Sequence, residues 1–442
     1  MTGWPSPGER EEDRATPEAY SPETRTFWTL LVVAALVRAA IMPSGGFPTD
    51  IGTFKGWATA LAEQGPGGFY GGGFADYLPG YMYVLWVIGE LNRVLRFSDQ
   101  AFLFAIKLPA AIADLIGAVL VRRLATRIVS PRAALLLAAF YLFHPALIFT
   151  GAYWGQTDSV GAALALGAVA LFLRGHPLAW ALGVIALLVK PQTAPVLAVL
   201  GVALLRRTLL PPDHAEGRRP RPDLVIAAGL IAGATLWLLA APFGLGPGRL
   251  VALLRTGIAV YPYGSVVAFN LWGAVQGFWH SDADRILGYP VWLWGITAVA
   301  AGLAGILATV WRRPTDRSVL LGCAAALVAA FLLPTRIHER YLIPALPFLA
   351  LSPAIDRRQW GPYIWLSALL ALNLLYAYTR PYVQTFLLPP WLDRTVFSDT
   401  ATRIMSAAAL LTLPWLLGVL WTRRSGGEPG GEGDSRRQGI SS

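Results

Sequence analysis

Residues 47–81 read FPTDIGTFKGWATALAEQGPGGFYGGGFADYLPGY. This stretch follows the first hydrophobic segment and is too polar and too rich in glycine to cross a bilayer. It carries two acids, Asp50 and Asp76, beside aromatic residues and turns. Because the segments on either side are apolar, we expect the rest of the chain to hold this loop at the membrane surface.

The composition indicates a membrane protein. Of the 442 residues, 55% are hydrophobic and 14% are charged. Many apolar runs reach the roughly 17–25 residues that span hydrocarbon, so an all-α polytopic membrane protein is predicted. The net charge of +10 does not indicate a nucleic acid partner, because the basic residues lie in short loops at the ends of apolar runs. The single cysteine, Cys323, excludes an internal disulfide.

About twelve transmembrane helices are predicted. They lie near residues 26–42, 99–121, 133–151, 157–173, 177–189, 192–205, 223–241, 285–310, 318–334, 341–355, 361–378 and 402–421. With both termini in the cytoplasm, the arginine-rich loops all fall inside, as the orientation rule for short loops requires. The scarcity of lysine beside abundant alanine, glycine and proline is typical of a GC-rich bacterial genome, so the bacterial cell membrane is the predicted location.

The predicted domain organisation is a single transmembrane domain, residues 26–423, between disordered cytoplasmic tails at 1–25 and 424–442. Its first outer loop, residues 43–98, is expected to carry interfacial helices. The segment 78–97 is apolar enough to cross the membrane, but crossing would place the following arginine cluster outside. We therefore predict that 78–97 lies along the outer interface as a juxtamembrane helix.

In this topology the unusual polar residues gather on the outer face. They are Asp50, Asp76, Tyr77, Trp154, Gln156, Asp158, Lys190, Gln192, Arg336, His338 and Arg340. The inner face has arginine clusters but no comparable mixture of acids, amides, aromatics and bases. A mixture confined to one face predicts a functional site there.

Each acid of this set has two interpretations. Asp50 and Asp158 precede helical runs, and aspartate there is a favoured N-cap. As functional groups, Asp50 is a candidate general base that takes a proton from an attacking hydroxyl. Asp158, with Trp154 and Gln156, is a candidate sugar ligand. Asp76 is either a turn residue before a Pro-Gly bend or, with Tyr77 and Gln192, part of the substrate-binding set.

The bases also have two interpretations. Lys190 is one of three lysines and lies in an apolar context, where it either extends to the interface or contacts a lipid-linked phosphate. Arg336, His338 and Arg340 are further candidates for binding that phosphate, or are interfacial anchors. Farther into the membrane, Lys107 and Asp114 share a helix face, which favours a structural ion pair, direct or through a neighbour.

No metal-ligand spacing is present, so no metal site is predicted. A divalent ion at Asp50, Asp158 or Glu339 stays open at this point, and no other cofactor is implied. The stretch Gly71-Gly72-Gly73 lacks the following lysine and helix of a phosphate-binding loop.

The motifs, taken in order, resemble the GT-C superfamily of integral-membrane glycosyltransferases. They are Asp50 after the first span, Asp76-Tyr77-Leu78-Pro79-Gly80-Tyr81, Trp154-Gly155-Gln156-Thr157-Asp158, Lys190-Pro191-Gln192, Asn270-Leu271-Trp272 and His338-Glu339-Arg340-Tyr341. Within it, they are similar to bacterial proteins related to the second mannosyltransferase of GPI-anchor assembly. Thr49 and Ile51 flank Asp50, and Pro48 and Gly52 lie two residues away, so the second acid of an Asp-x-Asp metal site is missing.

This resemblance implies an inverting transfer of a hexose from a polyprenyl-phosphate donor to an acceptor hydroxyl on the extracytoplasmic face. The likeness to mannosyltransferases implies that the hexose is mannose. Asp50 would be the base, with Asp158 and Gln156 near the substrates and Lys190 and His338 near the donor phosphate. The acceptor, whether lipid, glycan or protein, is left open. A transporter or flippase of lipid-linked sugars is the alternative, but the chain shows no internal repeat. A non-catalytic assembly subunit would leave the one-sided cluster without a purpose.

Overall fold

The computed structural model describes residues 21–210, 219–382 and 389–422. Within these ranges the fold is all-α, as predicted, apart from one short hairpin in which β1 (Arg285–Ile286) pairs antiparallel with β2 (Tyr289–Pro290). The predicted disordered tails fall largely on residues 1–20 and 423–442, outside the described residues. The first helix begins at Pro22, earlier than the predicted start, because the side chain of Ser21 caps it.

The helices of the first half include the two of the outer loop. They are α1 (Pro22–Ile41), α2 (Pro48–Phe69), α3 (Pro79–Leu95), α4 (Asp99–Ala125), α5 (Pro131–Leu142), α6 (Pro145–Leu147), the π-helix Ile148–Trp154, α7 (Asp158–Phe172), α8 (Leu178–Val189) and α9 (Ala194–Leu209). Those of the second half are α10 (Pro222–Ala240), α11 (Pro247–Ala259), α12 (Leu271–Val275), α13 (Val291–Arg312), α14 (Asp316–Leu332), the 3₁₀ segment Glu339–Ala345, α15 (Leu346–Ile355), α16 (Trp360–Ala377), α17 (Pro390–Thr395), α18 (Asp399–Leu410) and α19 (Thr412–Trp421).

Seven helical segments in the described part are long and apolar enough to cross a bilayer. They are Pro22–Ile41, Asp99–Ala125, Pro131–Trp154, Pro222–Phe243, Val291–Arg312, Arg357–Arg380 and Asp399–Trp421. This pattern is that of a polytopic integral membrane protein. Every predicted segment contains a helix, but the others, such as α7 and α8, are shorter. The predicted count of twelve spans is therefore not confirmed.

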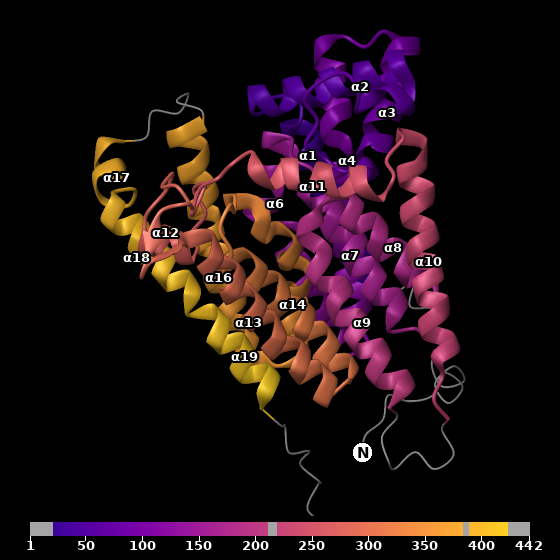
Figure 1. The fold of residues 1–442 in the computed structure, drawn as a ribbon, viewed down its shortest axis with the longest axis vertical. Coiled ribbons are helices and arrows are strands. Elements are labelled where there is room, and N and C mark those ends of the chain that lie inside the picture. The colour runs from indigo at the N-terminus through magenta and orange to yellow at the C-terminus, as the bar shows by residue number, and fades with distance from the viewer. Residues whose placement is uncertain (1–20, 211–218, 383–388, 423–442) are drawn as a thin grey trace, which may run out of the picture.

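Helices α2 and α3 pack against each other at one end of the molecule, beyond the ends of the long helices (Figure 1). Their contact is close because a Cβ on Gly89 would lie 1.9 Å from the carbonyl oxygen of Ala58. Phe54, Trp57 and Tyr81 fill the space between them. The segment predicted as a juxtamembrane helix is helical over α3, whose 17 residues leave it outside the candidate spans. Helix α11 runs across the long helices (Figure 1).

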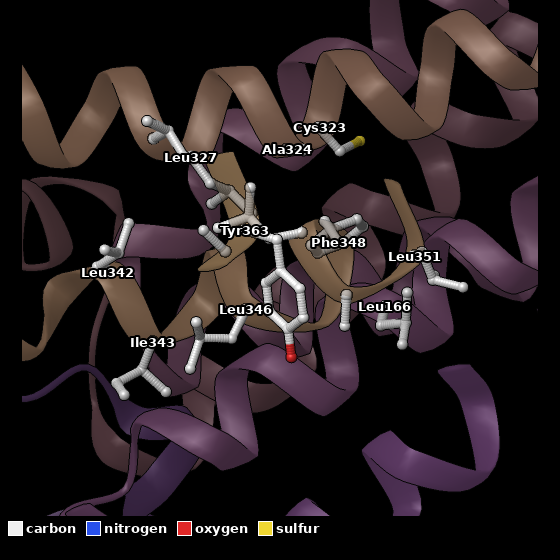
Figure 2. Packing of buried hydrophobic residues seen from close by; sticks show 14 of the residues in the cluster. Leu166, Cys323, Ala324, Leu327, Leu342, Ile343, Leu346, Phe348, Leu351 and Tyr363 are labelled. Carbon is white, nitrogen blue, oxygen red and sulfur yellow. The ribbon is translucent and has the colours of Figure 1, made fainter. Parts of the chain in front are cut away.

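The main core lies around α14 and α15, which are buried on almost every side. Figure 2 shows Leu346 and Phe348 of α15 between α14 and Leu166 of α7, with the ring of Tyr363 from α16 beside them. This packing ties the second half of the chain to the first. It places the segment just before α15, residues 338–341, against the start of α7.

A buried ion pair joins the first spans. The Nε of Arg38 in α1 donates to Oδ2 of Asp114 in α4 at 2.9 Å, and its Nη2 donates to the carbonyl oxygen of Leu142 at 2.8 Å. Both charged side chains are almost fully buried. The predicted partner Lys107 instead donates to the carbonyl oxygen of Ser44 at 2.8 Å. Asp114 therefore pairs with Arg38 of α1 and not with Lys107 of its own helix.

The variant Arg38→Met is expected to lower the free energy of unfolding by about 3–5 kcal/mol, because Asp114 would stay buried without its counter-charge. Thermal unfolding of the purified variants in detergent measures the effect. Adding Asp114→Asn should recover part of the loss. The control Arg25→Met, on an exposed position of α1, should change stability by less than about 0.5 kcal/mol. A wild-type melting curve for Arg38→Met would contradict this prediction.

Candidate functional site

Asp50 is the third residue of α2 and is half-buried. Its side chain does not cap the helix, so the N-cap interpretation is wrong; Phe47 occupies that position without a side-chain bond. Instead, Oδ2 accepts hydrogen bonds from Nε1 of Trp154, at 2.9 Å, and from Nε2 of Gln156. Among the described residues none donates to Oδ1. One oxygen is fixed in place and the other remains able to take a proton.

The turn that holds Asp50 comes from an interrupted helix. The chain forms a π-helix over Ile148–Trp154 and then reverses at Gly155, which has φ of 95°. The amides of Gly155 and Gln156 both donate to the carbonyl oxygen of Thr150. A Cβ on Gly155 would lie 2.5 Å from Cδ1 of Ile51 in α2, so only glycine fits. π-Helical turns are frequent at functional sites because they redirect side chains.

Asp158 is the first residue of α7 and is fully buried. Thr157 holds the N-cap position without a side-chain bond, so the capping interpretation of Asp158 is also wrong. Neither carboxylate oxygen accepts a hydrogen bond from a described residue. Two cations approach it: Nζ of Lys190 lies 3.5 Å from Oδ1 and Nε of Arg340 lies 4.0 Å from Oδ2. Asp158 is the shared counter-ion of these two bases.

Lys190 ends α8 in an extended conformation, before Pro191. Its side chain is buried, which contradicts the interpretation that it extends to the interface. Nζ donates to the hydroxyl oxygen of Tyr77 at 2.8 Å and lies 4.6 Å from the centroid of the same ring. Tyr77 belongs to the outer loop, so this contact fastens the loop to the end of α8. Burial raises the pKa of Tyr77, so its hydroxyl stays protonated at neutral pH.

Arg340 lies at the centre of the cluster. Nη1 donates to Oε1 of Glu339 at 2.9 Å, and the guanidinium lies 5.9 Å from the ring centroid of Trp154. Although burial opposes its charge, the carboxylates of Glu339, Asp50 and Asp158 raise the pKa of Arg340. Burial raises the pKa of Glu339, against the opposing effect of Arg340. Glu339 is therefore part of the site, a role that its place between two candidate bases in the sequence could have suggested.

His338 is buried beside two aromatic rings, with centroids 4.6 Å from that of Tyr261 and 5.2 Å from that of Tyr341. Burial and then the charges of Arg340 and Lys190 hold its pKa well below the ordinary value. The imidazole is therefore neutral at physiological pH. Tyr261 comes from the loop before α12, and no sequence signal marks it.

Because the pKa of His338 is lower in the folded than in the unfolded protein, stability should fall as the pH drops below about 6.5. The unfolded chain then binds a proton that the folded chain does not. The loss attributable to His338 is about 1.4 kcal/mol per pH unit until the folded pKa is reached. Unfolding of wild type and His338→Gln between pH 7 and 5 measures it. An identical pH dependence in both proteins would contradict the prediction.

The remaining candidates differ in how they relate to this cluster. Asp76 is half-buried and interacts electrostatically with Lys190 and Arg340; burial raises its pKa. Gln192 follows Lys190 in a 3₁₀ turn, and its Oε1 accepts no hydrogen bond from the described residues. Arg336 is engaged elsewhere: its Nε and Nη2 donate to the two oxygens of the buried Asp282. Its guanidinium is thus committed to a structural pair.

Six side chains from four distant segments therefore form one connected cluster. They are Asp50, Tyr77, Trp154, Asp158, Lys190 and Arg340. Hydrogen bonds, ion pairs and a cation–π contact link each to the next. Gln156 and Glu339 bind to this cluster through Asp50 and Arg340. No group of three or more His, Cys, Asp or Glu side chains that could hold a metal ion occurs in residues 21–210, 219–382 and 389–422. The site offers a partly open carboxylate beside two buried bases.

Comparison with known proteins finds no matching family model and no matching curated protein. Among solved structures, the chain is similar to ArnT from Cupriavidus metallidurans bound to undecaprenyl phosphate, with 16% identity, a TM-score of 0.49, and 90% of this chain and 77% of that chain covered. It is also similar to the oligosaccharyltransferase AglB from Archaeoglobus fulgidus in complex with an inhibitory peptide and a dolichol-phosphate. There the identity is 13% and the TM-score 0.43, over 89% of this chain and 56% of that one.

Proposed function

We propose that this protein is an inverting glycosyltransferase of the GT-C type. It moves a hexose, mannose by its motif resemblance, from a polyprenyl-phosphate donor to an acceptor hydroxyl. The proposal rests on one observation. Asp50, with one oxygen held and the other available, belongs to the same cluster as two buried bases, Lys190 and Arg340, that share the counter-ion Asp158. A base for the acceptor and cations for a leaving phosphate are the two requirements of this reaction.

The donor phosphate binds at Lys190 and Arg340. Charge-assisted hydrogen bonds are about 2.7–2.9 Å long, whereas these bases lie 3.5 and 4.0 Å from Asp158. Both therefore have donors that Asp158 does not use. Lys190 donates one of its three N–H groups to Tyr77, and Arg340 donates through Nη1 to Glu339. A phosphate can accept hydrogen bonds from the remaining N–H groups. Two cations, instead of a proton, then offset its negative charge.

In the reaction, the acceptor oxygen attacks the anomeric carbon on the face opposite the phosphate. The new carbon–oxygen bond forms as the bond to the phosphate oxygen breaks, and the configuration inverts. The acceptor proton passes to Oδ1 of Asp50, while Trp154 and Gln156 hold Oδ2 in place. Polyprenyl phosphate leaves with the bond electrons, and Lys190 and Arg340 stabilise its charge.

The membrane setting suits such a donor, whose phosphate must lie at the interface while its tail stays in hydrocarbon. Helix α2, which carries Asp50, and helix α3 lie at one end of the molecule (Figure 1), and α3 exposes apolar side chains such as Val87 and Val94. From the arginines of the opposite loops we place the site on the extracytoplasmic side and both termini in the cytoplasm. Asp76 and Gln192 are assigned to substrate binding.

The test uses the purified protein in liposomes with a polyprenyl-phosphate mannose labelled in the sugar and a membrane lipid extract as acceptor source. The expected result is loss of label from the donor with stoichiometric release of polyprenyl phosphate. A flippase would instead move the donor intact to the other leaflet. Translocation without cleavage would overturn the proposal.

A further inference from the structure

An apolar cavity of about 710 Å³ lies away from this site. It runs along α4 and α7, which pack side by side, with residues of α3 and α8 at its margins. On α4, the side chains of Ile112 and Ile116 line the cavity, and these residues are 46% and 50% exposed in the isolated chain. Side chains this apolar and this exposed on a membrane helix face lipid.

The only charges in the lining are three arginines at one end, Arg123, Arg127 and Arg174. None of their side chains forms a hydrogen bond or ion pair with another described residue. Arg127 and Arg174 line the same end of the cavity. Burial lowers the pKa of Arg127, and the like charge of Arg174 lowers it further. Asp316, the acid that acts on Arg127, is itself bound by Arg207 at 2.8 Å. This end of the cavity carries positive charge that the described protein does not balance.

The cavity is separate from the glycosyl-transfer site. Its lining contains none of the six residues of the cluster. Helix α7 places Asp158 at its first residue and Arg174 just beyond its end. Its 15 residues separate the two by roughly 22 Å at about 1.5 Å per residue.

We propose that this groove binds an anionic phospholipid of the membrane, with its phosphate at Arg123, Arg127 and Arg174 and its acyl chains along α4 and α7. The apolar walls match acyl chains, and the unbalanced cations match an anionic headgroup at the membrane face opposite the transfer site. A free phosphate would leave the apolar walls uncovered. The sugar donor would place its phosphate at the other end of α7.

The experiment is native mass spectrometry of the full chain in nanodiscs of dioleoyl phosphatidylcholine with added dioleoyl phosphatidylglycerol. Wild type should retain one phosphatidylglycerol in preference to phosphatidylcholine of the same chains. The variant Arg123→Gln/Arg127→Gln/Arg174→Gln should bind phosphatidylglycerol about 100-fold more weakly, from the usual contribution of each arginine near an anionic headgroup. Ala170→Trp, which fills the groove and keeps the arginines, should also lose the lipid.

The matched control is Arg219→Gln/Arg312→Gln/Arg357→Gln, which removes equal charge from exposed positions outside the groove and should bind as wild type does. If wild type retained the two lipids equally, the groove would hold only unselected bilayer lipid, and the proposal would be overturned. Normal binding by both groove variants would overturn it as well. Displacement of phosphatidylglycerol from the wild-type groove by polyprenyl phosphate, abolished by Lys190→Met, would assign the groove to the donor and also overturn the proposal.

Discussion

Asp50→Asn is expected to lower the rate of sugar transfer by about 10²–10⁴-fold while donor binding is retained, because a general base contributes that much. The amide oxygen of the variant can still accept the hydrogen bond from Trp154, so the turn at 154–156 should keep its place. The amide cannot take the acceptor proton. Transfer rate, donor affinity and thermal unfolding of the purified variant are the three measurements.

Asp99→Asn is the matched control for Asp50→Asn. Asp99 follows the same outer loop and its side chain is 94% exposed. Its variant should transfer sugar at the wild-type rate. If Asp50→Asn were also as active as wild type, Asp50 would not be the base.

Lys190→Met is expected to lower kcat/KM by about 10²–10³-fold, the usual effect of removing one group that stabilises developing negative charge. Loss of donor affinity should accompany it, since Lys190 is assigned to the phosphate in the ground state as well. The variant should also unfold more easily, because the buried Asp158 would keep only the more distant Arg340. Lys55→Met removes a lysine of α2 that pairs with the exposed Asp99. It should leave kcat/KM and donor affinity unchanged.

The double variant Lys190→Met/Asp158→Asn separates the two roles of Lys190. It removes the uncompensated buried carboxylate, so stability should return toward wild type. Donor binding should stay weak, because the phosphate still lacks one cation. Recovery of both stability and donor affinity would show that Lys190 acts only as the counter-ion of Asp158.

The helices and their order could be predicted from the sequence because apolar runs and proline or arginine boundaries set them directly. The interfacial position of α3, inferred from where crossing would place the next arginines, stays a prediction. The number of spans was harder to predict, because α7 and α8 are apolar but shorter than the roughly 17–25 residues that span hydrocarbon. Such helices are stabilised by burial in the protein, which a single-sequence pattern does not reveal.

Several of the clustered residues could be predicted from the sequence, but their contacts could not. The one-sided placement of polar residues singled out Asp50, Trp154 and Lys190, which the structure brings together. Local chemistry favoured N-caps for Asp50 and Asp158, yet tertiary partners more than a hundred residues from Asp50 determine its position. Likewise Arg336 pairs with Asp282 across 54 residues, a contact without a local signal.

The most direct measurement is the position of a bound, non-transferable polyprenyl-phosphate sugar analogue in an experimental structure of this protein. The phosphate is expected within about 3 Å of Nζ of Lys190 and of the guanidinium of Arg340, with the sugar between the phosphate and Asp50. A phosphate held instead at Arg336, or at Arg123, Arg127 and Arg174, with Asp50 remote from the sugar, would contradict the proposed mechanism.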